Sequence, residues 1–103
     1  MKYLIYILTL FSFCINAEAN NNNFFNEAKD LFEKEQYQES KFLFHRNIVY
    51  NPKDSASYLY LAKIFKIEED TRQEEKNIKT TLLLDPKNEE AMFLLIDIEL
   101  ERS

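Results

Sequence analysis

One histidine and a cluster of carboxylates are the side chains with the greatest capacity for chemistry in this sequence. His45 is the only histidine among the 103 residues, and no second histidine and no suitably placed cysteine or carboxylate accompanies it. Zinc sites and acid–base catalysts need such companions, so we predict that His45 lies on an outer face and is not catalytic. The chain also contains no glycine, which excludes a glycine-rich phosphate loop. We therefore predict no catalytic residue, no metal site and no cofactor, and we expect that the protein is not an enzyme.

One predicted turn is surrounded by five carboxylates: Glu68, Glu69, Asp70, Glu74 and Glu75. Calcium loops place oxygen ligands at alternating positions and use a glycine for the sharp bend, and this segment has neither feature. We therefore interpret it as a solvated acidic turn.

The net charge of −5 and the pI of about 4.9 weigh against nucleic acid or an anionic membrane as the main partner, because both attract positive charge. We expect a protein or peptide partner and no small-molecule substrate.

Residues 1–19 have the pattern of a secretory signal peptide. Lys2 is followed by an apolar run over 3–15, and Ala17-Glu18-Ala19 matches a small-x-small cleavage site. We predict cleavage after Ala19 and export to the periplasm or the exterior. The alternative is an uncleaved segment that tethers the protein to a membrane, although the apolar run is shorter than the ~20 residues of a membrane span. Cleavage removes the only cysteine, Cys14, so the mature chain cannot form a disulfide.

The rest of the chain reads as helices, because it lacks the glycine that sheet-rich folds need in their turns. After an asparagine-rich spacer over 20–23, apolar residues at helical spacing predict helices over about 24–34, from 37 to the first proline, and over about 55–67. Thr71-x-x-Glu74 fits a capping box that opens a fourth helix, and Asn88 is placed to cap a fifth. The prolines Pro52 and Pro86 end the second and fourth helices, and 86 − 52 = 34. The sequence therefore predicts a repeat of 34 residues, with units at about 21–54 and 55–88 and a partial unit at 89–101.

This pattern resembles the tetratricopeptide repeat (TPR), a family of helix–turn–helix units of the same length. With the prolines aligned, Ala28 and Ala62 occupy the family's small crossing position. Glu35 and Glu69 replace its turn glycine. The resemblance implies an all-α fold over 24–101, an α-solenoid of antiparallel hairpins with two complete units and one further helix. It also rests on Tyr37, Phe44, Leu61 and Phe65, while Ser40, Glu74 and Thr71 depart from it.

By this resemblance, the first helices of the units line a concave groove that binds a peptide or a helix. Lys29 and Lys63 are 63 − 29 = 34 residues apart, so they should lie on neighbouring helices and face the same way. They could hold a carboxylate of a bound peptide, or they could simply solvate one face. The residues implied as the partner-binding groove are Phe25, Lys29, Phe32, Leu59, Lys63, Lys66 and Phe93, with Asn22, Ile67 and Asp97 beside them.

The fifth helix carries apolar residues around nearly its whole circumference. One interpretation is that it packs broadly on the second unit and leaves a few apolar side chains exposed. The other is that Leu94 and Ile98 form an end face that binds a partner. The sequence thus supports two functions: a non-enzymatic scaffold that binds a peptide or helix in the groove, or a subunit of an envelope complex, or a homodimer, that docks through the last helix.

Overall fold

A computed structural model describes residues 23–103, and these residues form five helices and no strand. The all-α prediction is confirmed for this part of the chain. None of its helices is long and apolar enough to cross a membrane. The predicted signal peptide, its cleavage site, most of the spacer and Asn22 lie outside the described residues. The helices are α2 (Phe25–Glu33), α3 (Tyr37–Tyr50), α4 (Ser55–Ile67), α5 (Thr71–Leu84) and α6 (Glu89–Arg102).

The helix ends follow the turn chemistry of the sequence. α3 and α5 each end two residues before a proline, at Tyr50 and Leu84. Asn88 caps α6, because its Oδ1 accepts a hydrogen bond of 2.9 Å from the N–H of Ala91. The capping-box prediction for α5 is wrong by one residue: the N-cap is Asp70, whose carboxylate accepts from the N–H of Gln73 at 3.2 Å.

The two turns inside the hairpins have the same backbone geometry. Glu35 and Glu69, 34 residues apart (69 − 35), have left-handed φ angles of 62° and 61°. The N–H of the following residue reaches back five residues in both turns, from Gln36 to Leu31 and from Asp70 to Phe65, each at 2.9 Å. This is the Schellman end of a helix, in which glycine usually takes the left-handed position. The 34-residue period is therefore present in the backbone as well as in the sequence.

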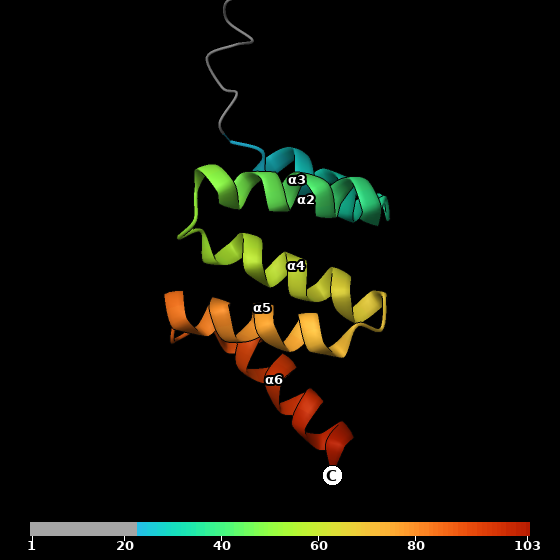
Figure 1. Ribbon diagram of the computed structural model, residues 1–103, viewed down its shortest axis with the longest axis vertical. Coiled ribbons are helices and arrows are strands. Elements are labelled where there is room, and N and C mark those ends of the chain that lie inside the picture. Colours follow the sequence, from blue (N-terminus) through green and yellow to red (C-terminus); the bar gives the residue numbers. More distant parts are fainter. Residues whose placement is uncertain (1–22) are drawn as a thin grey trace, which may run out of the picture.

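Each helix packs against the next one along the chain, in the order α2, α3, α4, α5, α6 (Figure 1). Two apolar clusters hold them together. The first contains Ala28, Phe44, Leu61 and Ile64 and joins α2, α3 and α4. The second joins α4, α5 and α6 and contains Leu59, Ala62, Ile78, Ala91 and Ile98.

A buried asparagine joins the first hairpin to the second. The Oδ1 of Asn47 accepts from the N–H of Phe24 at 3.0 Å, which holds the start of α2. Its Nδ2 donates to Asp54 at 3.1 Å and to Ser57 at 2.9 Å, at the start of α4. The Ser57 hydroxyl donates to the same Asp54 carboxylate at 2.7 Å. Asp54 therefore occupies the N-cap position of α4 but uses its side chain for this network and not for a backbone N–H.

Candidate partner-binding surfaces

The aromatic residues predicted for the groove pack into the protein. The Phe25 ring makes edge contacts with Phe44 and Tyr60, with centroids 5.8 Å apart in both cases. Phe32 meets Tyr60 in the same way at 5.1 Å, and Tyr60 stacks on Phe44 at 5.0 Å. Phe25 and Phe32 are partly buried, and their rings hold α2 against α3 and α4. These packing contacts explain why Phe25 and Phe32 are aromatic without invoking a bound partner protein.

Two of the three predicted groove lysines are paired with carboxylates of α6. The Nζ of Lys63 lies 2.5 Å from Glu90, and it also lies 4.9 Å from the centre of the Tyr60 ring. Lys66 lies 3.8 Å from Asp97. Lys63 is therefore already paired within the protein, and a carboxylate from a peptide would share it with Glu90. The 34-residue spacing could not reveal this pairing, because it depends on how α6 crosses α4. Lys29 is partly buried on α2.

Three predicted binding residues face the interior. Leu59 is in the core cluster of α4, α5 and α6, so it does not line an open groove. Ile98 is 1% exposed in that cluster, and Leu94 packs against it partly buried. Leu94 and Ile98 attach α6 to the rest of the protein, so the predicted end face does not lie on the exposed side of this helix. Ile67 is exposed at the end of α4.

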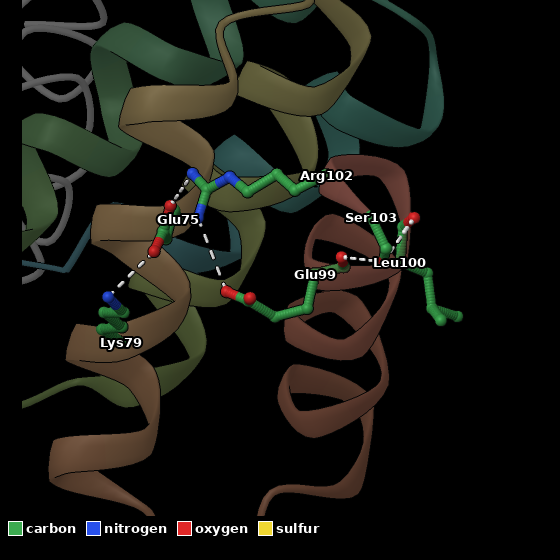
Figure 2. Close-up of polar contacts among 6 residues, drawn as sticks. All are labelled: Glu75, Lys79, Glu99, Leu100, Arg102 and Ser103. Carbon is green, nitrogen blue, oxygen red and sulfur yellow. Dashed lines mark hydrogen bonds and ion pairs between the residues drawn. The ribbon is translucent and has the colours of Figure 1, made fainter.

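The opposite side of α6 is apolar and exposed. Phe93 is 65% exposed, Ile96 51% and Leu100 68%. Figure 2 shows the Leu100 side chain on the side of α6 that faces away from α5. Met92, Phe93, Ile96 and Leu100 follow one another at positions i, i+1, i+4 and i+8, so they share one side of the helix. We call these four residues the α6 apolar stripe.

The internal period shows what covers the matching side of α4. Phe93 and Ile96 correspond to Leu59 and Ala62, since 93 − 59 and 96 − 62 are both 34. Leu59 and Ala62 are buried, and they share a core cluster with Ile78 of α5. In the second hairpin this side is therefore covered by the two helices that follow it, α5 and α6. Within residues 23–103, no helix covers the corresponding side of α6.

Acidic residues border the stripe on both sides. Glu90, Asp97 and Glu101 lie on the side of the lysine pairs, and Glu99 lies on the other. α6 contains five carboxylates and one arginine, Arg102. The exposed surface of α6 is thus an apolar strip between negative margins, with the exposed Glu89 at its amino end.

An ion-pair cluster fixes the carboxyl end of α6 to α5 (Figure 2). Arg102 contacts Glu75 and lies 3.4 Å from Glu99, while Lys79 lies 2.8 Å from Glu75. Hydrogen bonds from Arg102 and Lys79 lower the pKa of Glu75 to about 2. The cluster links the last turn of α6 to α5.

His45 is exposed on α3, with its ring 6.3 Å from that of Phe65. Partial burial and the positive charge of Lys41 lower its pKa. No three His, Cys, Asp or Glu side chains within the described range are arranged to hold a metal ion. The structure gives His45 an aromatic packing partner, Phe65.

Comparison with models of known protein families and with curated proteins finds no match for this sequence.

Proposed function

We propose that the protein is an exported, non-enzymatic binding module, a small TPR-like solenoid whose partner docks on the α6 apolar stripe. The partner presents a helix with an apolar side and basic flanks. This helix lies on α6 as α5 lies on α4. The proposal keeps the function expected from the sequence and moves the binding surface from the groove to the last helix.

The observation that carries the proposal is the uncovered side of α6. Leu59 and Ala62 on α4 are buried in the core with Ile78 of α5, and their counterparts Phe93 and Ile96 are exposed. Contiguous exposed apolar side chains with a polar rim are typical of protein-binding sites. Burying one such side chain stabilises a complex by about 1.5–3 kcal/mol.

The charge around the stripe indicates the kind of helix. An antiparallel second copy of α6 would bring carboxylates such as Glu101 and Glu99 towards its own acidic margins, which is unfavourable. Lysine or arginine flanks would complement those margins. Ile96 stands where the other two units have an alanine. In the first unit the small residue Ser40 crosses at this position and donates a hydrogen bond of 2.7 Å to the carbonyl of Ala28. The helix that binds over Ile96 therefore needs a small residue at the crossing.

The test measures binding of a designed, fluorescein-labelled amphipathic peptide by anisotropy. The peptide has leucine and alanine on one side of its helix and lysine on the flanks. We expect Ile96→Glu to weaken binding by about tenfold or more, because an apolar contact of roughly 1.5–3 kcal/mol is lost. The substitution makes the surface more acidic, so charge attraction alone predicts tighter binding.

Val49→Glu is the matched control, because Val49 is an exposed apolar residue of α3 and the charge change is the same. Equal loss of affinity in both variants would overturn the proposal. Lys29→Glu combined with Lys63→Glu tests the groove: loss of binding only in this double variant would favour it instead. Light scattering of the free protein should give the mass of one chain. A dimer that Ile96→Glu dissociates would show that a second copy is the occupant.

A further inference from the structure

A second feature beside the α6 stripe is a polar cavity of about 340 Å³. It lies where the carboxyl ends of α4 and α6 meet the start of α5. Its volume is in the range of small ligand pockets and is sufficient for the end of one long side chain. Leu100 of the stripe directly precedes Glu101, which lines the cavity. The cavity is lined by Lys66, Glu69, Thr71, Glu74 and Glu101.

Glu74 is the unusual residue of this cavity. It is only 5% exposed, and its carboxylate reaches the cavity without a hydrogen bond or ion pair within residues 23–103. Its counterpart in the first hairpin, Ser40, is buried and donates a hydrogen bond to the carbonyl of Ala28. A glutamate at this crossing position is too long to do the same, and its side chain lines the cavity. Most of this side chain is withdrawn from water, so a ligand that pairs with its carboxylate gains affinity.

The charges around the cavity favour a cation. Three carboxylates, Glu69, Glu74 and Glu101, face one lysine, Lys66, which also lies 3.8 Å from Asp97. Burial raises the pKa of Glu74, and the charges of Glu101 and Asp97 raise it further against the opposing effect of Lys66. No group of three acidic, histidine or cysteine side chains among the described residues is arranged for a metal ion. An organic cation, such as the charged end of a basic side chain, is small enough for the cavity of about 340 Å³.

We propose that this cavity is a receptor for one basic side chain, whose guanidinium or ammonium group pairs with the carboxylate of Glu74. Thr71 and Glu101 lie beside it as further hydrogen-bonding groups. That this basic side chain belongs to the helix bound to the α6 stripe rests on the proposed function. The existence of the receptor does not rest on it, so a free side-chain probe can test the receptor separately.

The experiment is an NMR titration of the full chain with N-acetyl-arginine N-methylamide. We expect saturable shifts of the backbone amides of Thr71, Glu74 and Glu101. Glu74→Gln keeps the shape and removes the charge, and it should weaken binding by about tenfold, the usual order for one charged hydrogen-bonding partner. Glu33→Gln, at an exposed glutamate at the end of α2, is the matched control and should bind as the wild type does.

The norleucine analogue of the probe should give no saturable shift, because it lacks the cation. Linear shifts spread over the acidic surface, equal in Glu74→Gln and Glu33→Gln, would overturn the receptor. So would saturation by magnesium chloride at the same amides. If the arginine probe binds while the amphipathic peptide does not, the receptor stands and the proposed function fails. If the peptide binds α6 while the arginine probe does not bind, the proposed function stands and the receptor fails.

Discussion

Two neighbouring glutamates of α5 show how strongly position decides the behaviour of a residue. Glu74 points to the inside of the hairpin, and burial raises its pKa. Glu75 lies one residue further round the helix, where Arg102 and Lys79 lower its pKa to about 2. The sequence shows both as members of one acidic turn. The structure gives the first a place in a cavity and the second a place in an ion-pair cluster.

The Glu75 cluster should make the attachment of α6 depend on pH. A carboxyl group whose pKa is depressed on folding, from 4.5 to about 2, stabilises the folded state above pH 4.5. This contribution is lost as the pH falls from 4.5 through 2. Glu75→Gln should therefore lower the free energy of unfolding at pH 7, and the difference from the wild type should shrink over this range. Denaturant unfolding at a series of pH values measures it, with Glu33→Gln as the control. A difference that does not change with pH would contradict the prediction.

The two left-handed glutamates predict a stabilising substitution. Glu35 and Glu69 have φ angles of 62° and 61°, which cost a non-glycine residue about 1 kcal/mol or more. Glycine has no such cost but loses more entropy on folding. We expect Glu35→Gly and Glu69→Gly each to raise the free energy of unfolding by about 0.5–1 kcal/mol. Lys76→Gly, at an exposed position in the interior of helix α5, should lower it by a similar amount. Thermal or urea unfolding distinguishes the two directions, and destabilisation by both turn substitutions would be the contrary result.

At the scale of the helices, much of the architecture could be predicted from the sequence. Pro52 and Pro86 set the ends of two helices within two residues, and Asn88 predicted the start of α6. The error at α5 has a clear cause. Asp70 follows the left-handed Glu69 directly, so the chain is not yet helical there, and its carboxylate caps the helix one residue before Thr71. Local chemistry of this kind is encoded within a few residues.

The orientation of α6 could not be predicted in the same way. Its apolar residues surround the helix, so periodicity does not indicate which side is buried. The choice depends on contacts with α5 and α4, including Ile98 in the core and the pair of Lys63 with Glu90. For this reason the sequence predicts a partner-binding end face at Leu94 and Ile98, whereas both side chains pack inward. Tertiary contacts decide this, and no local signal replaces them.

This orientation predicts different costs for two isoleucines of one helix. Ile98→Ala should lower the free energy of unfolding by about 2–4 kcal/mol, because it leaves a cavity in the core. Ile96→Ala should change it by less than about 0.5 kcal/mol, because the side chain is exposed. Urea unfolding of both variants makes the comparison, and equal costs would show that α6 packs differently.

The junction between the hairpins predicts a second contrast. Asn47→Ala removes partners of the N–H of Phe24 and of the side chains of Asp54 and Ser57, and should cost about 2–4 kcal/mol. Thr81 stands 34 residues later (81 − 47), is equally buried, and donates only to the carbonyl of Asn77 in its own helix, at 2.8 Å. Thr81→Val should therefore cost less than about 1 kcal/mol. Chemical denaturation of both variants tests the contrast; comparable costs would mean that Asn47 does not join the hairpins.

At the scale of the whole molecule, the two covered hairpins contrast with the uncovered helix. Consecutive helices bury each other from α2 to α5, and α6 adds one side to the core and leaves the other outward (Figure 1). The acidic margins and the cavity at Glu74 lie beside that outward side. We therefore propose that recognition occurs at this end of the molecule, while the aromatic cluster of α2, α3 and α4 holds these helices together.

Methyl NMR of isoleucine-labelled protein, titrated with the basic amphipathic peptide, tests this claim most directly. Ile96 lies on the α6 stripe, Ile67 is exposed at the end of α4 beside the predicted groove, and Ile64 and Ile78 are buried in the core. We predict that the Ile96 methyl shifts most and saturates with the peptide, while Ile64 and Ile78 change little. A saturating shift at Ile67 with Ile96 unaffected would place the partner in the groove and contradict the account.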